Sequence, residues 1–427
     1  MRWICSASGV LCILMAMVTV TVAPLANGSV YPWGMALCTF AGLLTLILGT
    51  LCWATLPAGH HPSHRANALW LMAVVLCGGW IGASTLWATE TTEASRYCRV
   101  WLAGLGAGVG IHLTALRYRH AGQWVLGAVV AAGTTSVGAA YLQDQGIPVP
   151  LLKHMVGVPE QFLTGSYFHP SHYSGYLVLV AGVVSSLLFF SKIHLHTPLL
   201  LMVLLGVNWA NFHTDGSSTP AVVMASGLPL LWWLWRHNRW LGVGLTALML
   251  AGGVAGAGLL LNAQGAPTFE AIKTHFGIRS QSFEGFWTIR QAVWDYGWRM
   301  FQDAPYLGHG VGQFGVISPM YRLSHETSPV YVHGGWVNYA HNDVLQILSE
   351  LGLVGLGLWL AVLLLAMVHR IQVFQLVLLT PLLIYLFTGI YDSHLTSIPG
   401  TMVSFYAVLG LAALKPPPSS SPSGTDP

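Results

Sequence analysis

LQILSELGLVGLGLWLAVLLLAMV, residues 345–368, contains a single charged side chain, that of Glu350. A helix needs about 20 mainly apolar residues to cross the hydrocarbon core of a bilayer. This run satisfies that length, so it predicts a membrane-spanning helix. Placing an acidic residue inside such a span costs free energy, so Glu350 is a candidate functional residue.

The composition of the whole chain agrees with this prediction. Of its 427 residues, 54% are hydrophobic and only 7% are charged, whereas soluble domains carry roughly a quarter charged residues. So few charges cannot coat a water-facing surface of this size. The formal net charge is only +3, and the absence of basic runs excludes nucleic acid as a partner. The chain is therefore predicted to be an all-α integral membrane protein.

Hydropathy predicts about 12 transmembrane helices with one large outer loop between helices 9 and 10. Ala23-Pro-Leu-Ala26 weakly resembles a signal-peptide cleavage site, but the long apolar run before it favours a retained first helix. The predicted spans are 4–25, 33–56, 67–88, 97–115, 123–141, 173–191, 197–212, 218–235, 240–262, 345–368, 371–391 and 397–414.

The charged residues support this topology. If the N-terminus is cytoplasmic, every predicted inner segment contains at least one Lys or Arg, as the positive-inside rule requires. Of the acidic residues, only Asp426 then lies on the inner side. We therefore predict that both termini are cytoplasmic.

The spans divide the chain into four regions. Residues 1–262 form helices 1–9, residues 263–344 form the large outer loop, residues 345–414 form helices 10–12, and residues 415–427 form a disordered cytoplasmic tail. Long translocated loops are exempt from the positive-inside rule. The basic residues of the outer loop are Lys273, Arg279, Arg290, Arg299 and Arg322.

Two patterns stand out within this loop. WTIRQAVWDYGWRMF, residues 287–301, places aromatic and basic residues at helical spacing, which predicts an amphipathic helix at the membrane surface. The glycines of PYLGHGVGQF, residues 305–314, predict a tight, irregular backbone around His309. A plain connecting turn and a ligand-binding loop explain the second pattern equally well.

A polar cluster precedes the tenth span. Asn342 can cap that helix, and Asp343 favours its positive end. Asp343, Gln346 and Glu350 share one helix face. Glu350 is as readily a structural partner for an arginine or a backbone group as a functional acid. His341 lies at the membrane boundary, where a lone histidine more often forms hydrogen bonds than catalyses.

Neither the histidines nor the cysteines predict a metal or disulfide framework. The chain has 19 histidines, but the clusters His60–His61–His64 and His194–His196 lack neighbouring carboxylates or cysteines. The six cysteines form no CxxC pair, which suits small buried hydrophobes. We predict no metal and no cofactor.

Three segments carry a family pattern. They are YAHNDVLQILSELGLVGL at residues 339–356, RQAVW at 290–294 followed by APYLGHGVGQF at 304–314, and TGSYFHPSHYSGYL at 164–177. Together they resemble the motifs of the O-antigen ligase/polymerase superfamily, except that His172 replaces the usual asparagine in the last. The resemblance covers roughly residues 160–365, with the three motifs in the family's order.

This resemblance implies a periplasmic active site in a bacterial inner membrane. Members transfer a glycan from undecaprenyl diphosphate to an acceptor hydroxyl, with inversion and without metal. It implies that Arg290 binds the diphosphate, while His341 orients or deprotonates the acceptor; both are the predicted catalytic residues. The predicted substrate-binding residues are Arg279, Arg299, Asn342, Glu350, His309 and His172.

One departure from the family pattern concerns an arginine. DGSSTPA, residues 215–221, stands where the family usually has an arginine in a GSR or SRG motif. Either another basic residue of the outer loop, such as Arg279 or Arg299, supplies that charge, or the donor chemistry is altered, or the chain is an inactive member.

Several activities stay open. The twelve-span frame favours a ligase that uses lipid A–core as acceptor, followed by a repeat-unit polymerase and then a protein O-oligosaccharyltransferase. A transporter or flippase for a lipid-linked glycan would need polar residues near the midplane of several spans. A purely structural membrane protein would not explain the basic outer loop.

Overall fold

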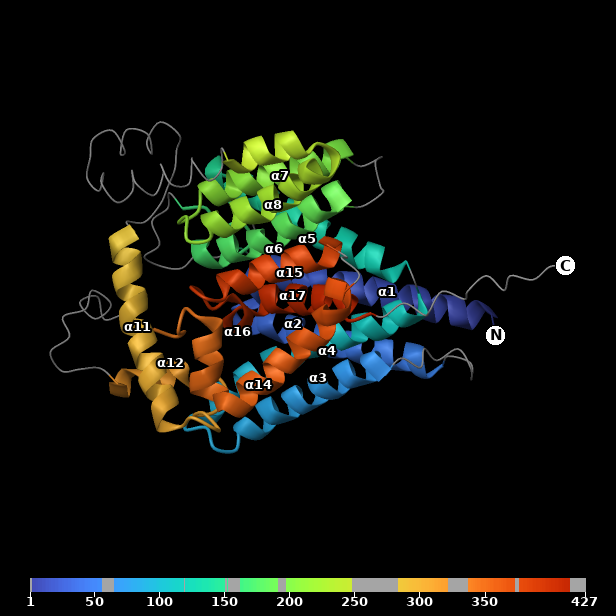
Figure 1. The fold of residues 1–427 in the computed structure, drawn as a ribbon. Coiled ribbons are helices and arrows are strands. Elements are labelled where there is room, and N and C mark those ends of the chain that lie inside the picture. The colour runs from blue at the N-terminus through green and yellow to red at the C-terminus, as the bar shows by residue number, and fades with distance from the viewer. Residues whose placement is uncertain are drawn as a thin grey trace.

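The computed structural model describes residues 2–55, 65–118, 120–149, 152, 162–190, 197–247, 283–321, 337–372 and 376–414, which fold into helices without strands (Figure 1). The elements are α1 (Arg2–Leu25), η1 (Asn27–Ser29), α2 (Pro32–Ala54), α3 (Arg65–Ser84), α4 (Thr91–Arg117), α5 (Ala121–Asp144), α6 (Pro170–Phe190), α7 (Thr197–Phe212), α8 (Thr219–His237), α11 (Phe283–Asp303), α12 (Phe314–Ile317), η3 (Ser318–Tyr321), α14 (Asp343–Gln372), α15 (Leu376–Thr388), α16 (His394–Ser397) and α17 (Pro399–Ala412).

The predicted spans fall on these helices. α1 to α8, α14, α15 and α17 coincide with eleven of them, whereas most of the predicted ninth span, 240–262, and the tail, 415–427, lie outside the described residues. Among the described residues, six helices, α2 to α6 and α14, are long and apolar enough to cross a membrane, and four shorter apolar helices accompany them. The chain is thus an all-α, multi-pass membrane protein. The count of twelve spans and the position of the large loop stay predictions.

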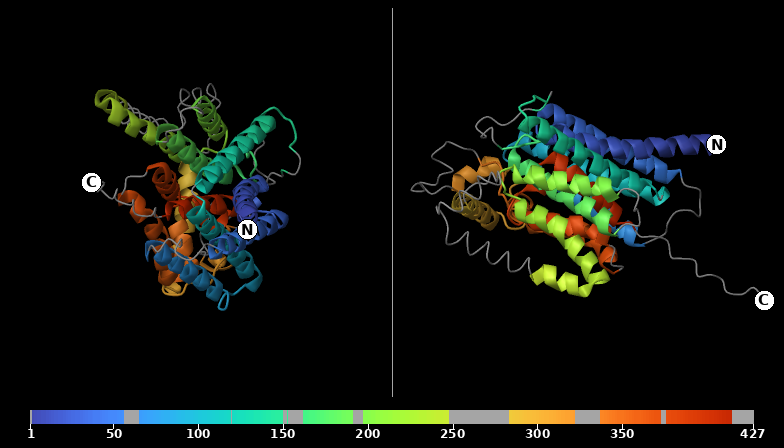
Figure 2. Two further views of the ribbon diagram at one scale, coloured as in Figure 1. Left: turned by 90° about the vertical axis from the view of Figure 1, so that its right-hand side faces the viewer. Right: turned by 90° about the horizontal axis from the view of Figure 1, so that it is seen from above.

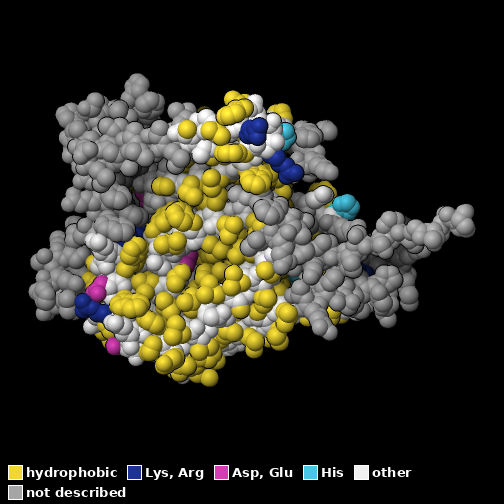
Figure 3. All heavy atoms as spheres, viewed as in Figure 1, with side chains coloured by type: hydrophobic (Ala, Val, Ile, Leu, Met, Phe, Trp, Pro, Cys, Tyr) yellow, Lys and Arg dark blue, Asp and Glu magenta, His cyan; other side chains and the backbone are white. Residues whose placement is uncertain are grey.

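Three helices form the centre of the bundle. Every residue of α17 is buried, and 78% of the most apolar window of both α4 and α6 is buried, against 33% for α2. α17 accordingly runs through the middle of the bundle in two directions of view (Figures 1 and 2). The outer helices present leucine, valine and tryptophan outward, as the predominance of hydrophobic side chains in Figure 3 shows. Lipid tails solvate such faces as readily as a protein core does.

Proline and acidic side chains help to define where helices begin. Pro32 and Pro399 occupy the first turn of α2 and α17, where the missing N–H has no helical partner to lose. The Glu90 side chain accepts a 3.0 Å hydrogen bond from Thr92 N and so caps α4.

Glycines allow α2 and α4 to pack closely. A Cβ atom at Gly49 would lie 2.3 Å from Gly110 O, and one at Gly110 would lie 2.2 Å from Thr45 O. A Cβ at Gly42 would similarly lie 2.5 Å from Ala103 O. Small residues at such crossings let two backbones approach within a membrane.

The amphipathic helix predicted at 287–301 is α11. It runs across the ends of the bundle helices instead of along them (Figure 1). It covers a separate small core of buried side chains. The members of this core are Val293, Met300, Phe314, Ile317, Ala340 and Leu345. α11 is therefore fixed to the start of α14, next to the polar cluster that the sequence analysis identified.

The glycine packing predicts opposite effects for two substitutions. Gly110→Ala inserts a methyl group against the backbone of α2 and should destabilise the protein by about 1–3 kcal/mol. Gly79→Ala on α3 meets no atom within 4 Å and should be neutral or slightly stabilising. Thermal unfolding of both variants in detergent measures the difference; equal melting temperatures would contradict this account of the helix crossing.

Candidate active site

The α14 helix is interrupted at Gly352, which adopts φ 67° and ψ −170°. An interrupted helix leaves backbone groups that must find partners. The segment 305–310 supplies them: Leu353 N donates to Pro305 O at 2.9 Å, and Gly310 N donates to Glu350 O at 2.8 Å. The loop and the broken helix therefore form one unit.

Glycine is required on both sides of this contact. A Cβ at Gly308 would lie 2.3 Å from Glu350 O, and a Cβ at Gly352 would lie 2.3 Å from Tyr306 O. Gly308, Gly310 and Gly312 all have positive φ values, 68°, 101° and 73°. The irregular backbone predicted for 305–314 is confirmed, and its contact with α14 explains it.

Glu350 holds the same loop through its side chain. Its Oε2 accepts a 2.8 Å hydrogen bond from Gly312 N, and its Oε1 accepts bonds from Phe314 N at 3.0 Å and Gln346 Nε2 at 2.7 Å. The residue is only 5% exposed. These contacts are those of a structural partner for backbone groups, which was one of the two interpretations of this acid.

The first turn of α14 fixes a second segment, residues 389–396. Asn342 Nδ2 donates to Ile390 O at 2.8 Å, and Asn342 Oδ1 accepts from Leu345 N at 2.9 Å, so the predicted helix cap is confirmed. The Asp343 carboxylate accepts from Thr396 N at 3.0 Å and from Thr396 Oγ1 at 2.8 Å. The loop between α15 and α16 is therefore held against the start of α14.

This arrangement places Asp392 between the two predicted catalytic residues. Its Oδ1 accepts a hydrogen bond from His341 Nδ1 at 2.9 Å, and its Oδ2 accepts one from Arg290 Nη2 at 3.4 Å. Arg290 Nε also donates to Tyr391 O at 3.1 Å. Only 4% of the Asp392 side chain and 8% of the Arg290 side chain are exposed, against 24% for His341. Arg290 and His341 thus share one buried carboxylate.

Burial and neighbouring charges set the charge states of Asp392 and His341. Burial alone would raise the pKa of Asp392, but His394, Arg290 and His341 together hold that pKa well below its ordinary value. Burial and the Arg290 charge lower the pKa of His341, and Asp392 only partly offsets them. A neutral His341 whose Nδ1–H faces Asp392 keeps a lone pair on Nε2.

The backbone of His341 is also unusual. Its φ is 50°, in the left-handed region that non-glycine residues seldom adopt. Its carbonyl accepts a 3.2 Å hydrogen bond from Trp294 Nε1 of α11. Strained backbone of this kind persists where surrounding contacts fix it and is typical of functional sites.

The other predicted site residues lie at different distances from the cluster formed by Asp392, Arg290 and His341. His172 is beside it: its ring centroid lies 6.2 Å from that of Tyr339, which in turn lies 6.5 Å from that of His341. Arg299 pairs with Asp295 at 2.6 Å, and His309 Nε2 lies 3.0 Å from Met300 O. Arg279 lies outside the described residues.

Asp392 and His394 were not predicted from the sequence as site residues. A signal was present, because Tyr391-Asp-Ser-His394 is a polar run between the last two predicted spans. His394 Nε2 lies 3.6 Å from Asp392 Oδ2. Among the described residues, no three His, Cys, Asp or Glu side chains are arranged to hold a metal ion.

The stretch that lacks the family's arginine also lies beside the cluster. Ser218 Oγ is 3.5 Å from His394 Nε2. Asp215 is 5% exposed and accepts hydrogen bonds from Ser217 N at 3.1 Å and Ser217 Oγ at 2.9 Å. Burial raises the pKa of Asp215 to about 6. This position therefore brings a buried carboxyl group, in place of a cation, close to the site.

Comparison with known families agrees with the motifs. The O-antigen ligase family model matches residues 200–360, which confirms the resemblance to the O-antigen ligase superfamily. The matched region includes Arg290, His341 and Glu350 and ends before Asp392. No curated protein matches the chain.

The buried ion pair predicts a stability cycle. Asp392→Leu removes the carboxylate next to the buried Arg290 guanidinium and should destabilise the protein by about 3–5 kcal/mol. Replacing both residues, as Arg290→Met with Asp392→Leu, should restore most of that loss, because no uncompensated charge remains. Denaturation of the wild type, both single variants and the double variant measures the cycle; a fully stable Asp392→Leu variant would show that the pair is not coupled.

Proposed function

We propose that this protein is a membrane glycosyltransferase that moves a glycan from undecaprenyl diphosphate to a hydroxyl group of lipid A–core, with inversion, at the periplasmic face of a bacterial inner membrane. The observation that supports this most strongly is the Asp392 carboxylate shared by Arg290 and His341. It combines a fixed cation with an oriented base, which are the two groups that this reaction needs.

His341 acts as the base in this proposal. Asp392 orients the imidazole through Nδ1–H, so that Nε2 can accept the proton of the acceptor hydroxyl. The acceptor oxygen then forms its bond to the anomeric carbon of the glycan. Attack from the face opposite the diphosphate inverts that carbon, and His341 afterwards releases the proton to solvent.

Arg290 acts on the leaving group. As the bond between the anomeric carbon and the diphosphate oxygen breaks, its electron pair passes to the diphosphate. A guanidinium held in place by Asp392 and Tyr391 stabilises that developing charge without first having to reorganise. Neither step needs a metal ion or a cofactor.

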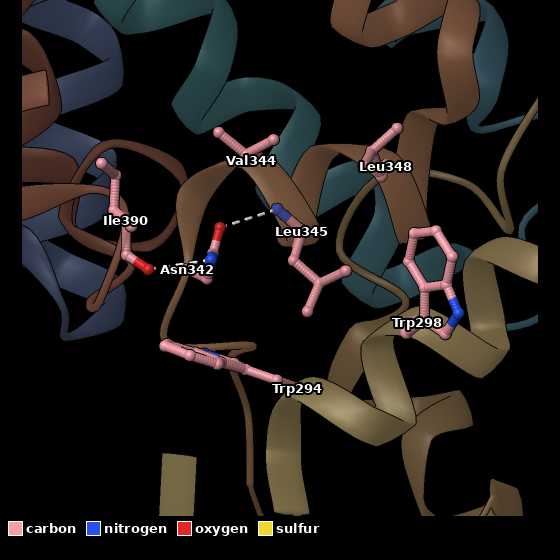
Figure 4. Close-up of a pocket in the computed structure, with 7 residues that line it drawn as sticks. All are labelled: Trp294, Trp298, Asn342, Val344, Leu345, Leu348 and Ile390. Carbon is pink, nitrogen blue, oxygen red and sulfur yellow. Dashed lines mark hydrogen bonds between the residues drawn. The ribbon is translucent and has the colours of Figure 1, made fainter. Parts of the chain in front are cut away.

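An apolar cavity of about 440 Å³ adjoins the site and suits the lipid part of the donor. In Figure 4, side chains from α11 and the start of α14 surround an open space next to Asn342. Trp298 is 48% exposed there and Ile390 is 52% exposed. The lining residues are Trp294, Trp298, Asn342, Val344, Leu345, Leu348 and Ile390. We assign this cavity to the isoprenoid units next to the diphosphate.

The remaining site residues receive supporting roles. Asn342 lines the cavity and is the neighbour of His341 in the chain, and the ring centroid of His172 lies 6.2 Å from that of Tyr339, so we assign both to contacts with substrate. Glu350 and His309 act indirectly by fixing the loop 305–314. We assign Arg279 and Arg299 to outer contacts with the donor, where they would supply the cation that residues 215–221 lack.

The acceptor distinguishes the related activities. A repeat-unit polymerase would use the same two groups on a glycan hydroxyl, and a protein O-oligosaccharyltransferase would use them on a serine or threonine. A transporter is less well supported, because the Arg290–Asp392 pair joins α11 to the loop after α15 and lies outside the apolar spans.

A deletion strain of the native host should accumulate bare lipid A–core on a lipopolysaccharide gel, with long polymer retained on the lipid carrier. Core with a single repeat unit would instead identify a polymerase. Plasmid-borne wild type should restore the ladder, whereas His341→Ala and Arg290→Ala should fail at equal expression. Restoration by either variant would remove the proposed site.

The pH dependence follows from the charge state of His341. A base must be unprotonated, and burial together with the Arg290 charge lowers the pKa of His341 from its ordinary value. The value of kcat/KM should therefore be constant above that lowered pKa and fall as the pH decreases through it, so the acid limb should lie below the pH at which an ordinary histidine titrates. A limb above pH 7 in reconstituted vesicles would argue against this base.

Filling the cavity should affect donor binding selectively. Leu348→Trp adds volume inside the cavity and should raise KM for the lipid-linked donor about 10-fold or more, while KM for the acceptor changes little. Leu360→Trp, on the exposed part of α14 further along the chain, is the matched control. Equal donor KM values for both variants would place the isoprenoid elsewhere.

A further inference from the structure

His394 contacts the oxygen of Asp392 that His341 does not use. Its Nε2 lies 3.6 Å from Asp392 Oδ2, within ion-pair range, whereas His341 bonds to Oδ1. The same Nε2 is 3.5 Å from Ser218 Oγ. Its side chain is 1% exposed, so it cannot itself contact a substrate. Any effect of His394 on the reaction must therefore pass through Asp392.

The tautomer of His394 follows from its partners. Nδ1 is buried without a hydrogen-bond partner among the described residues, whereas Nε2 faces two oxygen atoms. The proton of the neutral ring therefore belongs on Nε2, directed at Asp392 and Ser218. In this form the ring presents its positive end to the carboxylate.

The imidazole is fixed from several sides. A Cβ at Gly175 would lie 2.4 Å from ring atoms Cε1 and Nε2, so α6 can approach only because residue 175 is glycine. Tyr385 of α15 lies with its ring centroid 6.3 Å from that of His394. The Asp343 carboxylate accepts from Leu395 N and Thr396 N, which fixes the backbone that follows. The ring therefore has little room to leave the carboxylate.

We propose that His394 is a positioning residue that sets the basicity of His341 through their shared carboxylate. Each hydrogen bond that Asp392 accepts disperses the negative charge of the carboxylate. The carboxylate then attracts the proton of His341 less strongly. His394 thereby keeps more of His341 in its unprotonated, competent form. This inference rests on the proposed role of His341 as the base.

Other ionisable groups surround His394 and contribute to the same balance. Arg290 and His341 reach it through Asp392, and His172 reaches it from α6. Asp343 lies on the backbone side and Tyr385 on α15. Burial lowers the pKa of His394 itself, which keeps the ring neutral near pH 7. Asp215 faces Asp392 and Arg290 from the loop before α8.

The test is the acid limb of kcat/KM, measured with full-length protein in vesicles of bacterial phospholipid. His394→Leu removes the donor, and Gly175→Ala keeps the imidazole but displaces it. Each should move the acid limb upward by at least half a pH unit, which corresponds to a fall in kcat/KM of about 3-fold on the acid side of the limb. His394→Gln keeps an N–H near the Nε2 position and should leave the limb within about 0.2 units of the wild type. His237→Gln, an exposed histidine outside the site, is the control.

The outcomes separate this inference from the proposed function. An upward shift in both His394→Leu and Gly175→Ala, together with an unshifted His394→Gln, supports the positioning role. A folded leucine or alanine variant with an unshifted limb overturns it, as does a shifted limb in His394→Gln. Transfer by His341→Ala at the wild-type rate would instead overturn the proposed base, independently of His394.

Discussion

The Asp392 carboxylate is the interaction on which the site depends. A charge that is 4% exposed must be compensated, and this one accepts hydrogen bonds from His341, Arg290 and the backbone N–H of Ser393. The His341 and Arg290 side chains lie 51 and 102 residues away from it in the sequence. Removing the carboxylate would therefore release both the His341 imidazole and the Arg290 guanidinium. A single buried charge thus couples the geometry of α11, the start of α14 and the loop after α15.

The surrounding fold serves to hold those three segments together. The break at Gly352 would leave backbone groups unsatisfied in a membrane protein if the loop 305–310 did not pair with them. Glu350 and Asp343 point from the same helix into two different loops and satisfy the backbone N–H groups of each. Glycines at 308 and 352 allow the necessary close approach. Polar contacts and irregular backbone are concentrated at the start of α14, while residues 351–368 of that helix are apolar.

Much of this arrangement could be predicted from the sequence. Apolar runs identified the helices because membrane spans have a strong compositional signal, and the spacing of Asn342 and Asp343 identified a helix start. The resemblance identified Arg290 and His341. Asp392 escaped prediction because nothing in its local sequence shows which distant side chains it meets. The two interpretations of Glu350 could not be separated for the same reason: its partners, Gly312 and Phe314, lie 38 and 36 residues away. His394 looked like one of many histidines until the fold placed it beside the carboxylate.

The most direct measurement of the central claim is glycan transfer by purified Asp392→Asn in vesicles that contain a polyprenyl-diphosphate-linked glycan and lipid A–core. The amide has nearly the shape of the carboxylate but lacks its charge, so it can neither compensate Arg290 nor hold His341 in the competent tautomer. We predict that transfer falls roughly 100-fold or more while the variant stays folded and monodisperse in detergent. Transfer at the wild-type rate by folded Asp392→Asn would contradict the account.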